Sequence, residues 1–272
     1  MTPTLNGENV GNDIIYIRIL GYLIHFVPTD LGLRVVVTEI LSAKSDRGLL
    51  DVGKMYFDHF IRAFRATKGR IPTPSNHASP PEFDTVADML NDTLEDAPQS
   101  YSTAKKALFR DGYRCAVTGK CDIRSVLVIT ELREKLNADR SLKMDEIHCA
   151  HIFAESTNQD IELGSLKVWF VATNVENRYK LEAAEPFILN NYPEYVTFKT
   201  PDSVKFPVPS VAYLAIHAAC AKVAHLSGAG AYIDKFYRDM DDSTTLDPSG
   251  ASAEMLKHAI FELQVAGRPI SN

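Results

Sequence analysis

Apolar residues recur at two different spacings along the chain, and each spacing predicts a type of element. The run Ile14–Val27 is rich in Ile, Tyr, Phe and Val, is broken by Gly21, and ends before a proline, which predicts two short strands. Apolar positions over 31–41 and 52–66 follow a helical stripe, and Asp30 is placed to cap the first of these two helices. Further short strands are expected near 113–118 and 146–153.

The C-terminal part of the chain predicts helices. Pro209 precedes a long run rich in Ala and Leu that reaches Ser227, and Gly228 is placed to end this helix. Ala229–Met240 and Ala253–Leu263 have the spacing of two further helices. Helices are therefore expected to outnumber strands.

The composition changes this picture little. The chain has 272 residues, of which 45% are hydrophobic and 24% charged, as in ordinary globular proteins. Four cysteines are too few for a disulfide framework and fit a reduced compartment. The apolar run Ile14–Val27 contains Arg18 and is too short to span a bilayer, and acidic residues precede it, unlike in a secretory signal. We expect a cytoplasmic protein with no membrane partner; a nuclear location fits the same features, and the oligomeric state stays open.

The charge pattern disfavours a nucleic-acid partner without excluding one. The net charge is −6 and the pI about 5.8, whereas phosphate binding relies on a basic face. The charge is unevenly distributed. Glu82–Asp96 has six acids and no Lys or Arg, which predicts an acidic surface helix, while Lys105–Arg124 has six basic residues against two acids, a net +4.

Two segments carry the candidate chemistry. They are LFRDGYRCAVTG over Leu108–Gly119 and IHCAHI over Ile147–Ile152. Together they resemble the HNH (ββα-metal) nuclease family, in particular its fungal branch. The runs Leu214–Ala219 and His225–Asp234 resemble the C-terminal signature of the same branch.

The resemblance implies an α+β fold with a small ββα-metal core wrapped by N- and C-terminal helices. Residues 1–104 are then an N-terminal strand and helix elaboration, 105–190 the HNH-like core, and 191–272 a C-terminal helical part of one compact domain. Within the core, Arg114–Thr118 and Glu146–Phe153 are expected to pair as antiparallel strands against a helix drawn from Val168–Ala184.

In this family the two strands and the helix hold one divalent cation, and a strand His activates water. His151 matches that general base. It follows Ala150, where the wider family often has an Asp ligand, and no His occurs from 152 to 216 to complete the metal site. Asn174 or Asn177 are the candidate replacements for the missing helix ligand. Other possible donors are Glu155, Glu182 and His148.

The incomplete ligand set favours a fold that has lost nuclease chemistry. We expect metal-independent acid–base catalysis, such as a cyclisation, isomerisation or elimination, on a small organic molecule and without a cofactor. The candidate catalytic residues are His151, His148, Asn174 and Glu155. One alternative is a metal-dependent endonuclease or phosphodiesterase, with Mg²⁺ or Mn²⁺ held by His151, Asn174 and Asn177. The other is a catalytically silent binding protein.

Two further groups of residues have metal-binding chemistry but are expected to pack. The spacing of the possible zinc donors differs from that of common zinc sites, and strand alternation sends neighbouring donors to opposite faces. These donors are Cys115, Cys121, His148, Cys149 and His151. His217 and His225 share one helix face and are expected to pack and hydrogen-bond within a helical layer.

Overall fold

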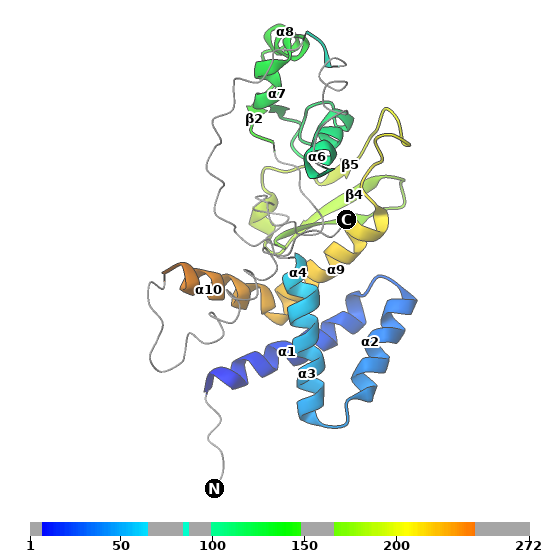
Figure 1. The fold of residues 1–272 in the computed structure, drawn as a ribbon, viewed down its shortest axis with the longest axis vertical. Coiled ribbons are helices and arrows are strands. Elements are labelled where there is room, and N and C mark those ends of the chain that lie inside the picture. The colour runs from blue at the N-terminus through cyan, green and yellow to red at the C-terminus, as the bar shows by residue number, and fades with distance from the viewer. Residues whose placement is uncertain (1–6, 65–83, 87–98, 148–165, 243–272) are drawn as a thin grey trace. The chain divides into compact units, whose positions relative to one another are not determined.

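The computed structural model describes residues 7–64, 84–86, 99–147 and 166–242 (Figure 1). The chain divides into two compact units. The first consists of Met1–Ile61 and Val223–Asn272, and the second of Arg62–Lys222. The parts expected from the sequence end at residues 104 and 190 because they follow the family resemblance, whereas the two units follow the packing of the chain.

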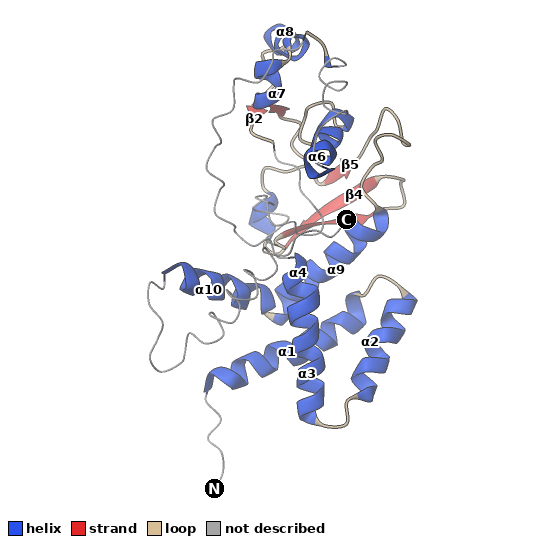
Figure 2. Ribbon diagram, viewed as in Figure 1, coloured by secondary structure: helices blue, strands red, loops and turns tan. Residues whose placement is uncertain are grey.

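The described residues of the first unit form helices (Figure 2). Helix α9 crosses the boundary between the units, and φ is +83° at Gly228, where the helix ends. This confirms the predicted helix and its stop, and α10 confirms the helix predicted directly after it. The helices are α1 (Gly7–Phe26), α2 (Asp30–Ser42), α3 (Asp46–Tyr56), a π-helical turn η1 (Phe57–Ile61), α9 (Val211–Ser227) and α10 (Ala229–Asp242).

The two strands predicted over Ile14–Val27 are wrong, because all of this run except Val27 lies within the 20-residue helix α1. Its apolar residues point both inward and outward. Ile19, Leu20 and Leu23 are buried, whereas Ile14, Ile17 and Ile24 are exposed. A helix that is apolar on most sides has no clear helical stripe, so its β-branched residues suggested strands. Gly21 is tolerated within the helix and does not break it.

The predicted helices over 31–41 and 52–66 are confirmed in type. The cap of the first differs from the prediction, because Thr29 and not Asp30 is the N-cap, with its hydroxyl accepting the N–H of Gly32 at 3.1 Å. Asp30 occupies the first helical turn, where a negative charge is also favourable. In the second, α3 continues through η1 into α4 (Arg62–Phe64).

Helices α1 and α3 pack closely at a glycine. A Cβ atom placed on Gly53 would lie 2.6 Å from the backbone oxygen of Tyr16, so only glycine permits this approach. The ring of Phe57 packs beside this contact, 5.6 Å from the ring of Tyr16 and 5.7 Å from that of Tyr232 on α10. Asn12 also donates to the Tyr232 hydroxyl at 3.2 Å. These contacts tie α1, α3 and α10 into one helical core.

The second unit contains the described strands of the protein, which form two sheets. The smaller pairs β1 (Cys121–Asp122) in parallel with β2 (Met144–Asp145), and the larger has the order β3-β4-β5. The strands of the larger sheet are β3 (Val168–Ala172), β4 (Arg178–Ala183) and β5 (Tyr195–Thr197). The helical elements before and between them are α6 (Gln99–Arg110), α7 (Ile123–Val128), α8 (Thr130–Ala138) and a 3₁₀ turn η2 (Pro186–Leu189).

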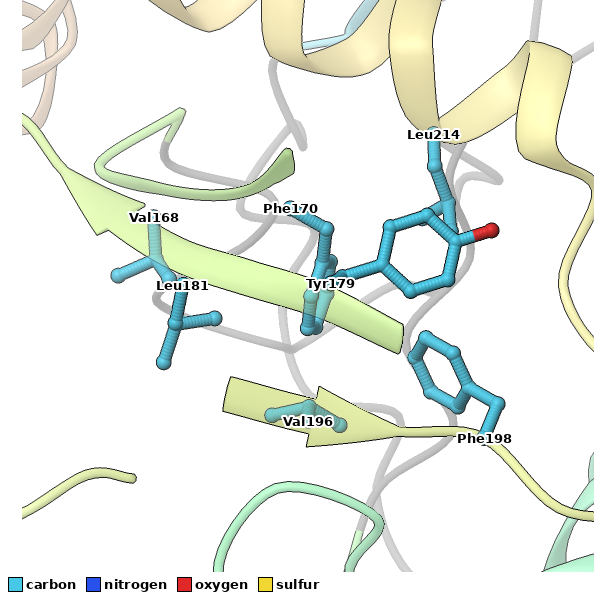
Figure 3. Close-up of a cluster of buried hydrophobic side chains, with 7 residues drawn as sticks. All are labelled: Val168, Phe170, Tyr179, Leu181, Val196, Phe198 and Leu214. Atoms are coloured by element: carbon cyan, nitrogen blue, oxygen red, sulfur yellow. The ribbon is translucent and has the colours of Figure 1, made fainter. Parts of the chain in front are cut away.

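The helix expected from Val168–Ala184 is wrong, because this segment is the antiparallel hairpin β3–β4. Val168 and Phe170 alternate with Trp169 along β3, and Tyr179 and Leu181 alternate with charged residues along β4, which is the period of a strand. One face of the sheet forms the core of the unit. Figure 3 shows Leu214 of α9 lying against these side chains, which are Val168, Phe170, Tyr179, Leu181, Val196 and Phe198.

Arg114–Thr118 and Glu146–Phe153 are expected to pair as antiparallel strands, and the described residues of these segments are arranged differently. Arg114 forms a single antiparallel bridge with Cys121, and residues 116–118 form a turn. The second segment is described only to Ile147, beside β1, and the pairing beyond it lies outside the described residues. The mixed class of helices and sheets is confirmed, and the ββα-metal core stays a prediction. The helices expected over 82–96 and 253–263 also lie largely or wholly outside the described residues.

We predict that Gly53→Ala destabilises the first unit by about 1–3 kcal/mol, because the new methyl group would force α1 and α3 apart. Gly21→Ala is the matched control, since a Cβ there meets no atom within 4 Å. In this exposed helical position alanine should stabilise by about 0.5–1 kcal/mol. Urea denaturation followed by far-UV circular dichroism measures both changes. Equal effects of the two substitutions would contradict the close contact at Gly53.

Candidate functional site

The first half of the motif Leu108–Gly119 ends helix α6. The N–H of Tyr113 donates to the Leu108 carbonyl at 2.8 Å, and the N–H of Gly112 donates to the Phe109 carbonyl at 3.0 Å. These two bonds form a Schellman motif, with Gly112 in the left-handed region at φ +65°. The side chains of Tyr113 and Leu108 pack together, as is common at such a helix end. The sequence Asp-Gly-Tyr is therefore a helix stop.

Arg110 and Asp111 hold this helix end by a two-pronged ion pair. Nε and one terminal nitrogen of Arg110 each donate to a carboxylate oxygen of Asp111 at 2.7 Å. Another terminal nitrogen of Arg110 donates to the Pro207 carbonyl at 3.1 Å. The pair is largely buried, so its charges are directed to each other and to the backbone. Both residues of the motif thus have structural contacts.

The second half of the motif is a tight turn. The N–H of Cys115 donates to the Lys120 carbonyl and the N–H of Gly119 donates to the Cys115 carbonyl, each at 2.8 Å. Gly119 has φ +71°, and the Thr118 N–H donates to Sγ of Cys115 at 3.4 Å. The turn predicted at Thr118-Gly119 is confirmed.

The buried carboxylate of Asp122 follows this turn and joins three segments. Its own N–H donates to the Tyr113 carbonyl at 2.9 Å. Its Oδ2 accepts the N–H and the hydroxyl of Ser125 at 2.8 and 2.6 Å, which caps α7. Its Oδ1 accepts the N–H of Ile147 at 3.2 Å. Asp122 therefore fixes the start of the segment that carries His148 and His151.

The basic residues around the turn form ion pairs with acidic neighbours. Lys120 donates to Asp145 at 2.6 Å, and Arg124 pairs with Glu146. The hydrogen bond and charge of Asp145 raise the pKa of Lys120. Asp145 and Glu146 lie outside Lys105–Arg124, so these two pairs neutralise part of its net +4 charge. Any phosphate bound at this turn would have to compete with the carboxylates.

Of the expected site residues, His148, His151 and Glu155 lie outside the described residues, as does Cys149. Asn174 and Asn177 lie in the turn between β3 and β4, and Asn174 is exposed. Asn177 has φ +56°, and its carbonyl accepts the Phe198 N–H at 2.9 Å. Asparagine tolerates this left-handed conformation better than most residues. The turn geometry therefore accounts for Asn177 without a ligand role.

Of the other metal-binding candidates, the described cysteines and His217 pack as expected, whereas His225 does not. Cys121 and Cys220 are buried, and Cys115 is partly buried. His217 is buried with its ring 5.9 Å from that of Phe64, whereas His225 is exposed in the last turn of α9. Among the described residues, no group of three His, Cys, Asp or Glu side chains is arranged to hold a metal ion.

A concave pocket of about 420 Å³ lies at the end of the β3–β4 hairpin. Strand β4, η2 and the loop leading to β5 supply its lining residues, together with Trp169 of β3. Pro186, Leu189 and Pro193 are apolar lining residues. The volume falls within the range of small-molecule sites. Its charged lining residues are Lys180, Glu182 and Glu194.

The charged centre of this pocket is Glu182. Its Oε2 accepts Nε1–H of the buried Trp169 and an N–H of Lys222 on α9, each at 3.0 Å. Partial burial alone would raise the pKa of Glu182. The hydrogen bonds from Trp169 and Lys222, and the charges of Lys222 and Lys180, outweigh this effect and lower the pKa. Glu182 is therefore ionised at neutral pH.

Comparison of the chain with models of protein families, with curated proteins and with solved structures finds no match. The resemblance to the HNH family therefore stays a prediction. None of the described helices combines the length and apolar character needed to cross a membrane.

Sequence reasoning missed two residues that matter here. Asp122 is followed three residues later by Ser125, a spacing typical of a helix N-cap, so a closer search for caps would have found it. Lys222 gave no such signal. It lies 40 residues after Glu182 in the sequence, and only the packing of α9 brings the two together.

We predict that Asp122→Ala destabilises the second unit by about 2–3 kcal/mol, because two backbone N–H groups and one hydroxyl lose their acceptor. Asp139→Ala is the matched control. Asp139 accepts the N–H and hydroxyl of Ser141 at 3.0 and 2.6 Å, but at an exposed site, so its loss should cost about 0.5 kcal/mol. Urea denaturation followed by Trp169 fluorescence measures both. Similar losses in the two variants would contradict the joining role of Asp122.

A second prediction concerns acid. Because folding lowers the pKa of Glu182, its ionised form stabilises the fold above the ordinary value of 4.5, and this stabilisation is lost as the pH falls through the lowered pKa. The free energy of unfolding of the wild type should therefore exceed that of Glu182→Gln at pH 6, and this difference should be smaller at pH 3. Urea denaturation at both pH values measures the difference. Exposed Glu194 serves as the control: Glu194→Gln should show a much smaller change, and a pH-independent gap for Glu182→Gln would contradict the prediction.

Proposed function

We propose that this protein is an acid–base catalyst that acts on a small organic molecule without a metal ion, in a cyclisation, isomerisation or elimination. The observation that carries the proposal is the pocket at the end of the β3–β4 hairpin. Its apolar walls surround an ionised carboxylate, Glu182, that is fixed by an indole and an ammonium group. Such a pocket suits a compact organic molecule better than an exposed phosphodiester backbone.

The contacts of the motif support the same proposal. Arg110, Asp111, Gly112 and Tyr113 end a helix, and Cys115 begins a tight turn. Because these residues stabilise the fold, the proposal explains why the motif is present in a protein that does not cleave nucleic acid. A fold does not fix a function, so the resemblance alone does not imply nuclease chemistry.

In this proposal the resemblance supplies the catalytic group, His151. An imidazole with an ordinary pKa near 6.5 exchanges protons at neutral pH without a metal. A well-placed general acid or base contributes about 10²- to 10⁴-fold to a rate. His148 and Glu155 are the further candidates for this role, and Asn174, whose amide does not titrate, is a candidate for hydrogen-bonding the substrate.

The ion pairs around the turn bear on the alternative, a metal-dependent phosphodiesterase. That alternative would use the basic residues near the turn to bind phosphate. Lys120 and Arg124 are instead paired with Asp145 and Glu146. Exposed pairs of this kind are weak, so they lower the affinity for phosphate without abolishing it.

The test of this proposal combines two assays on the full chain. In the first, a library of small organic compounds is incubated with the protein in EDTA, and conversion is followed by mass spectrometry. We expect at least one compound to be converted, with a rate about 10²- to 10⁴-fold lower in His151→Ala. His59→Ala removes an exposed imidazole and should leave both the rate and the melting temperature unchanged.

The second assay incubates plasmid DNA with the protein and Mg²⁺ or Mn²⁺. Nicking that requires the metal and is lost in His151→Ala would establish the nuclease alternative and overturn the proposal. A His151→Ala protein with a lower melting temperature and an unchanged rate would show that His151 is a packing residue. Binding without conversion of any compound would favour the silent binding protein.

A further inference from the structure

The pocket contains an acceptor atom that the fold does not use. A carboxylate offers about four lone-pair positions on its two oxygens. The bonds from Trp169 and Lys222 both go to Oε2 of Glu182. Among the described contacts, Oε1 of the same carboxylate accepts none. A partly buried, ionised oxygen beside apolar walls is a strong site for a hydrogen-bond donor from a ligand.

We propose that this pocket binds a small organic cation with an apolar body, whose N–H group donates to Oε1 of Glu182. The proposal deepens the proposed function, because it names the class of molecule that would be the substrate. It rests on that function only in taking the bound molecule to be the substrate. Binding itself depends on the pocket alone.

The charges of the lining favour a cation over a neutral or anionic molecule. Glu182 and Glu194 contribute two negative charges, and Lys180 contributes one positive charge. Lys222 adds a second positive charge, but it is held at 3.0 Å on Oε2 of Glu182. The four charges balance, so the preference comes from Glu182 itself: an anion beside it would meet a carboxylate that two donors hold in place. A cationic N–H donor gains a charge-assisted hydrogen bond instead, which is stronger than a neutral one.

The walls determine the rest of the ligand. Pro186, Leu189 and Pro193 are apolar, and the aromatic residues Trp169 and Tyr192 also line the pocket. Burial of apolar ligand surface here contributes about 25 cal/mol per Å². The charged end of Glu182 thus selects the head of the ligand, and these walls select an apolar or aromatic body.

The chain offers a direct reporter for this pocket. Trp169 is its single tryptophan, and its indole both lines the pocket and donates to Glu182. Fluorescence excited at the red edge of the tryptophan band therefore reports on this site. We choose benzamidine as the probe, with benzamide and benzoate as neutral and anionic analogues of nearly the same shape.

Benzamidine should change the Trp169 fluorescence in a saturable way, benzamide should bind about tenfold more weakly, and benzoate should bind weakest of the three. Glu182→Gln should weaken benzamidine binding by about tenfold or more. The matched control is Glu185→Gln, because Glu185 is exposed and does not line the pocket. It should bind as the wild type does.

A second variant separates loss of the site from loss of the fold. Lys222→Met removes the cation that competes for Glu182, so benzamidine should bind several-fold more tightly, the opposite of the effect of Glu182→Gln. Melting temperatures of both variants check that they fold. Benzoate that binds as tightly as benzamidine, an unchanged affinity in Glu182→Gln, or weaker binding in folded Lys222→Met would each overturn the inference.

The outcome is independent of the catalytic proposal. His151→Ala should bind benzamidine as the wild type does. If benzamidine binds as expected but no compound is converted, the proposed function fails and the cation site stands. If a compound is converted and benzamidine does not compete with it, the cation site fails as the substrate site and the proposed function stands.

Discussion

Asp122 is a buried carboxylate that joins three segments of the second unit. Its backbone N–H is bonded to the end of the helix stop at Tyr113, and its side chain caps α7 and holds Ile147. Ile147 is the last described residue before His148, so the segment that carries both candidate histidines begins at this contact. A buried carboxylate without its donors would be costly, which makes the three segments depend on one another.

The motif around Asp122 consists largely of residues with structural contacts. Each of Arg110, Gly112 and Tyr113 has a contact that ends α6, and these contacts need neither a metal nor a nucleic acid. The charge of the motif also differs between the sequence and the fold. Counted along the sequence, the basic segment has a large positive charge. In the fold, acidic residues of β2 and just after it pair with its basic residues, as Asp145 pairs with Lys120. Local sequence charge therefore overestimates what is available to bind phosphate.

The sequence predicts an element well where the signal is local. Helices α9 and α10 follow from Pro209 and Gly228, and the turn at Thr118-Gly119 follows from its residue types. The prediction fails where apolar residues occupy both the buried and the exposed sides of an element, because the spacing then no longer identifies it. Helix α1 is apolar on most of its surface and shows no clear helical stripe, whereas β3 and β4 do alternate as strands do. The expected helix at β3–β4 came from the family resemblance, which the local β-branched residues contradict.

The pocket could not be predicted for a different reason. Its central contact joins a β4 carboxylate, a β3 indole and an α9 ammonium group, and none of these has a neighbour in the sequence that indicates the others. The fold nevertheless explains why Glu182 lies beside Trp169. A buried Trp169 requires an acceptor for its N–H, and a carboxylate is a strong acceptor that this hydrogen bond helps to keep ionised. Glu182 meets this need through Oε2, which also pairs with Lys222 of α9, and among the described contacts its Oε1 accepts no hydrogen bond.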